Sequence, residues 1–181
     1  LPYKPLVKFL EKLMENPSRR STEELYRFLE HRQMPLTPDG NFLAYKGIRE
    51  DYTDWYSGKF SNKVGETLEM SRNGVCDDAN HGCSSGFHAG SLEYAEGYGN
   101  GGHLMVVEIN PEDVVSVPND CDCQKLRTCK YKVVDKYSTK MPDTLCAKYY
   151  NADEDEDEDE DYDKDSFNAG YAKACTEMSG E

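Results

Sequence analysis

The sequence contains no uninterrupted apolar run close to the roughly 18 residues that a membrane-spanning helix requires. Its beginning lacks the signal-peptide pattern of a basic segment, an apolar stretch and small residues at a cleavage site. The seven cysteines are an odd number, and without a secretory signal they favour free thiols in a reducing compartment over a disulfide framework. We therefore expect a cytoplasmic protein without a membrane-spanning helix.

A strongly basic segment is also missing, and the formal net charge of the 181 residues is -14. Most of this charge lies in residues 153–165, DEDEDEDEDYDKD, where eleven carboxylates and one lysine give -10. Residues 166–181 add -1, so residues 1–152 carry only -3. Without a basic region the long-range attraction to phosphates is missing, and we expect no nucleic-acid partner.

The acidic run has no apolar surface to bury and its like charges repel one another, which predicts a largely disordered tail over residues 141–181. A solvated tail without a specific partner is the simplest interpretation. The alternative is a nucleic-acid mimic that attracts a basic partner. Deleting residues 152–181 distinguishes the two, because only the mimic needs the tail for partner binding.

A helical hairpin is predicted over residues 1–40. The apolar residues of KPLVKFLEKLMENPS recur at the spacing of one helix face, and Pro17 ends the pattern. In the following segment, STEELYRFLE, Ser21 and Glu24 have the capping-box spacing that begins a second helix. The segment between the two helices is short, which is typical of a hairpin.

From residue 41 the apolar period changes from helical to alternating, which predicts strands. The predicted strands are NFLAYKGI, DYTDWYSGKF, GETLEM, HLMVVEI and VVSVP, with LRTCKYKVVDKY as one further strand that has a wet face. LEYAEGY is predicted as a short helix capped by Ser91. We therefore expect an α+β fold, in which a mostly antiparallel twisted sheet over residues 41–140 shares one core with the hairpin.

Cys83 and His88 place a thiol and an imidazole close together in HGCSSGFHAG. A catalytic thiolate needs its pKa lowered by an imidazolium or a helix N-terminus. Nearness in sequence does not give hydrogen-bond reach, because successive strand residues point to opposite faces. We favour a packing cysteine and a structural histidine over a catalytic pair, and predict no catalytic residues.

The cysteines and histidines also suggest a metal site at first sight. Structural zinc ligands usually come in pairs separated by two to four residues. Cys76 and Cys83 are separated by six residues, and Cys121 and Cys123 by one. We therefore expect no metal and no cofactor.

An enzymatic alternative follows from the order YKG, GFHAGSLEYAEGYG and VVEI, which is similar to the layout of ADP-ribosyltransferase-type folds. This similarity implies a nucleotide- or NAD-handling domain that acts against host defence. The residues of its candidate cleft are Tyr45, Lys46, Cys83, His88, Ser91 and Glu108.

Six blocks occur in one order between about residue 5 and residue 135. They are LEKLMENPSRRSTEELYRFLE, LTPDGNFLAYKGIREDYTDWYSGKFSNKVG, EMSRNGVCDD, CSSGFHAGSLEY, VVEINPEDVVSVPND and KLRTCKYKVV. In this order the chain resembles the RIIB family of phage proteins. The residues that match the family pattern are Asn62, Gly65, Cys83, Gly86, His88, Lys125, Arg127, Cys129 and Tyr131.

The resemblance implies a cellular role rather than a chemical one. RIIB-like proteins act with a larger A partner to protect the infected bacterium from prophage exclusion and premature lysis, and are associated with the host membrane. Longer members carry an N-terminal helix-turn-helix-like segment that is missing from this sequence, which begins with Leu1, so DNA binding is not expected. We expect a non-enzymatic domain in the host cytoplasm or peripheral at the inner membrane, binding an RIIA-like phage protein or a host defence protein.

A cluster of aromatic residues is the candidate contact surface, since Trp and Tyr are enriched at protein interfaces. The alternative is that these side chains belong to the core. The residues are Tyr52, Trp55, Tyr56 and Phe60.

Overall fold

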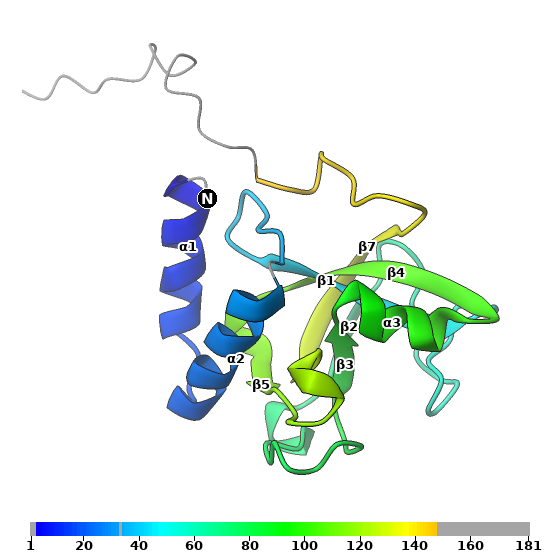
Figure 1. Ribbon diagram of the computed structural model, residues 1–181, viewed down its shortest axis with the longest axis horizontal. Helices are drawn as coiled ribbons and strands as arrows, with labels where there is room; N and C mark the ends of the chain where they lie inside the picture. Colours follow the sequence, from blue (N-terminus) through cyan, green and yellow to red (C-terminus); the bar gives the residue numbers. More distant parts are fainter. Residues whose placement is uncertain (1–2, 33, 148–181) are drawn as a thin grey trace, which may run out of the picture. The chain divides into compact units, whose positions relative to one another are not determined.

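The computed structural model describes residues 3–32 and 34–147, with the elements drawn in Figure 1. Within these residues the α-helices are Tyr3–Met14 (α1), Arg19–Arg32 (α2) and Leu92–Gly99 (α3). The strands are Phe42–Arg49 (β1), Thr67–Glu69 (β2), Phe87–Gly90 (β3), Gly102–Ile109 (β4), Val114–Ser116 (β5), Lys125–Thr128 (β6) and Lys130–Lys136 (β7). Short 3-10 helices are Arg72–Gly74 (η1), Pro111–Asp113 (η2) and Cys121–Cys123 (η3). The predicted α+β class is confirmed.

One sheet contains all seven of these strands, in the order β2-β7-β4-β1-β3-β6-β5, and every neighbouring pair is antiparallel. β1 and β4 pair along their whole length. β1 and β3 pair at a single position, Tyr45 opposite Gly90. The sheet is therefore continuous on one side of β1, whereas on the other side β1 and β3 diverge.

The side chains of β1 alternate between two faces of the sheet. Phe42 and Ile48 belong to the main hydrophobic core. On the opposite face α3 crosses β1 at Gly47, where a Cβ would lie 2.6 Å from the Ala95 carbonyl oxygen and from the Gly99 nitrogen. A glycine at this position allows α3 to pack directly on the strand.

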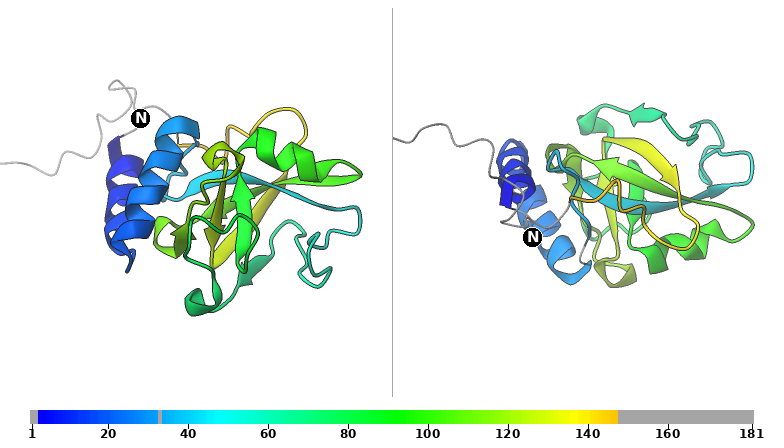
Figure 2. Two further views of the ribbon diagram at one scale, coloured as in Figure 1. Left: turned by 60° about the horizontal axis from the view of Figure 1, so that its bottom comes forward. Right: turned by 90° about the horizontal axis from the view of Figure 1, so that it is seen from above.

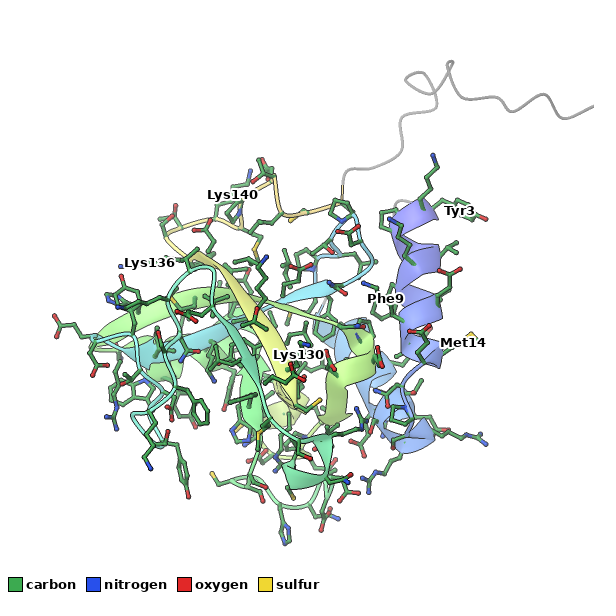
Figure 3. The ribbon with its side chains drawn as sticks, turned by 180° about the vertical axis from the view of Figure 1, so that it is seen from behind. Tyr3, Phe9, Met14, Lys130, Lys136 and Lys140 are labelled. Carbon is green, nitrogen blue, oxygen red and sulfur yellow. The ribbon has the colours of Figure 1, made fainter. Side chains whose placement is uncertain are left out.

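The α1–α2 hairpin lies beside β5, as the views in Figures 1 and 2 agree. Figure 3 shows Phe9 pointing from α1 toward the sheet, while Tyr3 and Met14 point away from it. Phe9 and Leu25 belong to the same hydrophobic core as the sheet residues. Burial of this shared apolar surface is what holds the hairpin on the sheet.

Polar side chains of α2 also reach the backbone of β5 and the residue that follows it. The Ser21 hydroxyl donates to the Val115 carbonyl at 2.5 Å, and the Glu24 carboxylate accepts the Val117 N–H at 2.8 Å. The predicted capping box is therefore wrong. α2 begins earlier, and the Ser18 hydroxyl accepts the Ser21 N–H at 3.2 Å. The Ser-x-x-Glu spacing instead puts both side chains on the helix face toward β5.

Two strand predictions are also wrong. DYTDWYSGKF is a loop, with one isolated bridge between Thr53 and Ser61 at its base. LRTCKYKVVDKY is divided into β6 and β7 at Cys129, whose N–H donates to the Asp113 carbonyl at 3.0 Å. All four residues of β6 are buried, so the predicted wet face exists in β7 alone.

Composition led to two further expectations, one about membrane-spanning helices and one about the acidic run. None of the helices among residues 3–32 and 34–147 has the length and apolarity that a bilayer-spanning segment requires. The acidic run lies outside the described residues, so its predicted disorder stays a prediction.

Candidate functional site

Glu108 and His88, at the two ends of the candidate cleft, do not meet. Glu108 lies opposite Leu43 on β1, and the antiparallel register places His88 alongside Gly47. Four residues of extended strand separate these two positions on β1, or about 13 Å. Glu108 instead accepts the Asn41 side-chain N–H at 2.8 Å.

The other cleft residues have surroundings of their own. Tyr45 packs edge-on against Tyr137, with 5.2 Å between ring centroids, and burial raises its pKa. Ser91 caps α3 as predicted, accepting the Tyr94 N–H at 3.1 Å, while Cys83 is exposed in the loop before β3. The part of the chain that the structure describes contains no group of three His, Cys, Asp or Glu that could hold a metal ion. The strand register therefore separates Glu108 from His88, the other end of the candidate cleft.

Lys46 occupies the place where β1 and β3 diverge. Its ammonium group donates to the His88 carbonyl at 2.7 Å and lies 5.5 Å from the Tyr131 ring centroid. Burial lowers the Lys46 pKa to about 8. Burial, with the positive charges of Lys46 and Arg127, lowers the His88 pKa to about 4. A neutral His88 at pH 7 supplies no positive charge to activate a thiol.

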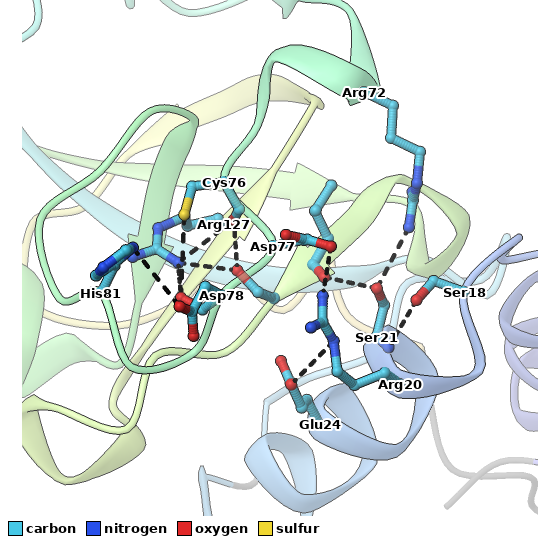
Figure 4. A network of polar contacts seen from close by, with 12 residues as sticks. Ser18, Arg20, Ser21, Glu24, Arg72, Cys76, Asp77, Asp78, His81 and Arg127 are labelled. Carbon is cyan, nitrogen blue, oxygen red and sulfur yellow. Dashed lines mark hydrogen bonds and ion pairs between the residues drawn. The ribbon is translucent and has the colours of Figure 1, made fainter.

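Arg127, a family-matched residue on β6, organises residues 75–86, which we call the thiol loop (Figure 4). It is fully buried. Nη1 donates to the carbonyls of Cys76 and Asp78 at 3.4 and 3.2 Å, and Nη2 donates to the Gly82 carbonyl at 3.3 Å. A guanidinium holds several donors in one plane, which suits a loop whose carbonyls lack strand partners.

Residues 50–66, which we call the aromatic loop, join β1 to β2 and present large apolar side chains to solvent. The exposed fractions are 42% for Trp55, 101% for Tyr56, 43% for Phe60 and 55% for Val64. Aromatic side chains left in solvent on one loop are typical of a protein-contact surface. Val64 is an addition to the predicted set.

Two predicted contact aromatics also touch the interior. The Tyr52 ring lies 4.3 Å from the His103 ring, centroid to centroid, and packs against the main core. The Phe60 ring meets the buried Phe87 ring edge-on at 5.2 Å. Tyr52 therefore anchors the aromatic loop, Phe60 both anchors and faces solvent, and Tyr56 is the most exposed of the predicted contact residues.

One carboxylate, that of Asp54, holds the tip of the aromatic loop. Its oxygens accept the N–H groups of Ser57, Lys59 and Phe60 at 2.6, 3.1 and 2.9 Å, and the Ser57 hydroxyl at 2.8 Å. Burial alone would raise the Asp54 pKa, but these hydrogen bonds outweigh it and lower the pKa to about 2. The carboxylate is therefore charged, and the tip closed, at neutral pH.

Two further contacts fix the base of the aromatic loop. Buried Asn62 accepts the Tyr131 hydroxyl at 2.5 Å and donates to the Phe60 carbonyl at 2.9 Å. The Arg49 guanidinium donates to the Trp55 carbonyl at 2.8 Å and lies 5.7 Å from the centroid of its ring. The loop is thus held at base and tip, and Asn62 and Tyr131 are both family-matched residues.

The remaining family-matched residues include two glycines of the loops and two residues on or next to β6. Gly65 and Gly86, near the ends of the aromatic and thiol loops, have φ values of 95° and 131°, a region that glycine adopts readily. Lys125, 2% exposed, pairs with the Asp120 carboxylate at 2.6 Å. Burial raises the pKa of the Cys129 thiol, as expected for a packing cysteine.

Sequence reasoning does not find Asp54 or Arg49. A signal for Asp54 exists, because an Asp three residues before Ser57-Gly58 is typical turn composition. Arg49 carries no such signal, since a charged residue at a strand end is common. Arg127 is matched by the family pattern, yet its partners in the thiol loop lie 45 to 51 residues away in sequence, beyond any local pattern.

Comparison with known proteins assigns the sequence to a family. The family model described as "Bacteriophage T4 protein rIIB" matches residues 4–146. Protein rIIB of Enterobacteria phage T4 is 41% identical over 128 residues, which cover 70% of this chain and 41% of that protein. The chain thus spans about two fifths of that relative's length. No solved structure matches.

Proposed function

The chain belongs to the bacteriophage T4 rIIB family, and from this premise we propose that it is a non-enzymatic protein-binding domain whose contact surface is the aromatic loop. The resemblance recognised from the six sequence blocks is thereby confirmed. In the proposed role the domain binds a larger A-type phage protein, in the host cytoplasm or peripherally at the inner membrane. Such a complex protects the infected cell from prophage exclusion and premature lysis.

The observation that carries the proposal is the combination of exposure and order in the aromatic loop. Tyr56 lies in solvent and Trp55 is 42% exposed, and Tyr and Trp residues dominate the energetics of many interfaces. Asp54, Arg49 and Asn62 already fix the backbone that presents them. A loop ordered before binding loses less conformational entropy in the complex, which favours affinity.

The residues of the candidate cleft are dispersed over the sheet, and this supports a binding function over catalysis by these residues. A general acid or base must come within hydrogen-bond reach of the reacting group. His88 and Glu108 are separated by about 13 Å along the sheet alone. Glu108 is already bonded to Asn41, and the buried Nε2 of His88 has no partner among the described residues.

The test measures binding of the purified chain to the purified A-type protein of the same phage by biolayer interferometry. We expect the double variant Trp55→Ala/Tyr56→Ala to weaken binding at least about 10-fold, because each ring is a candidate hot spot. Tyr26→Ala is the matched control, since Tyr26 is 60% exposed on α2. Its affinity should equal that of the unmodified chain.

Two results oppose the proposal. Unchanged affinity of the double variant rejects the aromatic loop as the contact surface. Absence of binding by the unmodified chain rejects the A-type partner. Co-purification from infected cells then tests a host defence protein, again with the double variant as the comparison.

A further inference from the structure

α1 carries apolar side chains on two adjacent faces. The first face packs into the main hydrophobic core and contains Leu6, Phe9 and Leu13. The second face, which we call the α1 seam, consists of Tyr3, Val7, Leu10 and Met14. Tyr3, Leu10 and Met14 are 72%, 43% and 85% exposed, and Val7 is partly exposed. In the part of the chain that the structure describes, this seam therefore faces solvent, as Figure 3 shows for Tyr3 and Met14.

The spacing of the seam residues is that of a helix in a coiled coil. Successive members are separated by four, three and four residues, which are the intervals between the a and d positions of a heptad. At 3.6 residues per turn the four side chains fall within a stripe about 60° wide. A helix that packs on a globular core usually has an apolar stripe wider than about 100°, whereas the narrow stripe is typical of pairing with one other helix.

Charged residues flank the seam on the side away from the core. With Tyr3 and Leu10 as d positions of the heptad, Lys4 and Glu11 both occupy the e position. Neither charged side chain has a hydrogen bond or an ion pair with any other side chain that the structure describes. One positive and one negative charge therefore remain available beside the same apolar row.

Two copies of the seam fit each other when their helices are antiparallel. With a two-fold axis between Val7 and Leu10, Tyr3 of one copy lies opposite Met14 of the other, and Val7 lies opposite Leu10. All four apolar residues then have an apolar partner. Contact between the Met14 sulfur and the Tyr3 ring is favourable in itself. The seam is thus complementary to its own copy.

The flanking charges favour the antiparallel orientation over the parallel one. In the antiparallel pair the two e positions lie on the same side, so Lys4 of each copy approaches Glu11 of the other. In a parallel pair each e position would face a g position of the other helix. The g positions are Leu6 and Leu13, which already belong to the core of their own copy. A second copy therefore supplies both the apolar row and the opposite charges that the seam needs.

We propose that the α1 seam binds a second copy of this chain through an antiparallel contact between the two α1 helices. α1 has 12 residues and is about 18 Å long, so the contact is smaller than the interface of a stable dimer. The dimer is therefore weak, with a dissociation constant between about 10 µM and 1 mM. It uses other residues than the aromatic loop, so it stands or falls independently of the proposed function.

The test is sedimentation velocity of the full chain under reducing conditions, at concentrations from about 5 µM to 1 mM. The sedimentation coefficient should rise toward that of a dimer as the concentration rises. Leu10→Gln/Met14→Gln should raise the dissociation constant at least about 10-fold, because it removes apolar contacts in every layer of the seam. Val64→Gln is the matched control, since Val64 is 55% exposed in the aromatic loop, and should leave the equilibrium unchanged.

A charge exchange tests the orientation of the two helices. Lys4→Glu should weaken the dimer about threefold or more, because it replaces two attractive pairs by two repulsive ones. Lys4→Glu/Glu11→Lys should restore the affinity, since the exchanged charges again face each other. Failure of this double variant to restore the affinity rejects the antiparallel pair. Circular dichroism checks that every variant keeps its helix content.

Two other results overturn self-association through the seam. The first is a chain that stays monomeric over the whole concentration range, and the second is a dimer that Leu10→Gln/Met14→Gln leaves unchanged. A monomeric chain whose binding to the A-type protein is weakened by Leu10→Gln/Met14→Gln would instead assign the seam to that partner.

Discussion

The aromatic loop and the thiol loop are two irregular segments on one sheet, and each is organised by one ionised side chain. Asp54 accepts hydrogen bonds at the tip of the aromatic loop, from N–H groups at most six residues away. Arg127 donates hydrogen bonds to carbonyls of the thiol loop from a strand 45 to 51 residues away. One loop is thus closed from within, the other from the sheet beneath it.

This difference indicates which loop needs the folded sheet to keep its conformation. Local hydrogen bonds around a turn close a small loop at little entropic cost. Contacts from β6 exist only after the sheet has formed. We therefore expect the aromatic loop to keep its turn under conditions that open the thiol loop.

The largest effect is expected from Arg127→Met. The substitution removes a fully buried guanidinium that donates to three carbonyls of the thiol loop and to the Ser116 hydroxyl, and each polar group left unpaired costs about 1–3 kcal/mol. We expect the free energy of unfolding, measured in urea, to fall by about 3–5 kcal/mol. Arg19→Met, on an exposed part of α2, is the control and should cause little change. A loss below about 1 kcal/mol for Arg127→Met would remove the contrast between the loops.

Asp54→Ala is expected to cost less, about 1–3 kcal/mol, because the freed N–H groups lie near solvent and can bond to water. Hydrogen exchange should show faster exchange at Ser57 and Phe60 and no change at Gly82. Asp39→Ala supplies a control, since its ion pair with Lys8 is exposed and contributes little. Accelerated exchange throughout the thiol loop would show that the two loops are coupled.

We expect the two loops to open at different pH values as the solution is acidified. The His88 pKa is lowered from 6.5 to about 4, so unfolded chains bind a proton between these values that folded chains do not. The His88 contribution to stability is therefore complete above pH 6.5 and lost as the pH falls toward 4. The lowered Asp54 pKa gives stability that is complete above 3.8 and lost as the pH falls through about 2.

Amide exchange followed by nuclear magnetic resonance across this range should therefore show opening near His88 and Arg127 before the aromatic loop opens. The variant His88→Gln should lose the part of the pH dependence between 6.5 and 4. Simultaneous opening of both loops at every pH would contradict the separation.

The smallest effect on stability is expected from Tyr56→Ala. Tyr56 lies wholly in solvent, and surface substitutions of this kind usually change stability by less than about 0.5 kcal/mol. A calorimetric melting temperature equal to that of the unmodified chain is therefore expected. A larger loss would mean that the ring packs against the protein, and it would then be a poor probe of partner binding.

Periodicity predicts the parts of this fold in which one face is buried and the other is wet. The α1–α2 hairpin, β1, β4 and the short helix α3 are found in this way. β6 is buried on both faces and separated from β7 by a bond between Cys129 and Asp113, sixteen residues apart, which no local pattern indicates. The same limit applies to Arg127, whose role depends on a loop far away in sequence.

The candidate site shows the same contrast between local sequence patterns and contacts that are distant in sequence. For Trp55 and Tyr56 the sequence leaves a contact surface and a core position open as alternatives, and in the structure the exposed fractions are 42% for Trp55 and 101% for Tyr56. The candidate cleft joins residues whose order in the sequence is similar to that of another fold. Strand register, which sequence alone does not give, separates His88 from Glu108.

The cover that α2 places over β5 has a further consequence. β5 is the last strand of the sheet, and its outer backbone groups are occupied by hairpin side chains, including Asn16, Ser21 and Glu24. A bare edge strand is a template on which other copies add strands. Removing the first two helices should therefore expose this edge of the sheet and favour strand addition between copies.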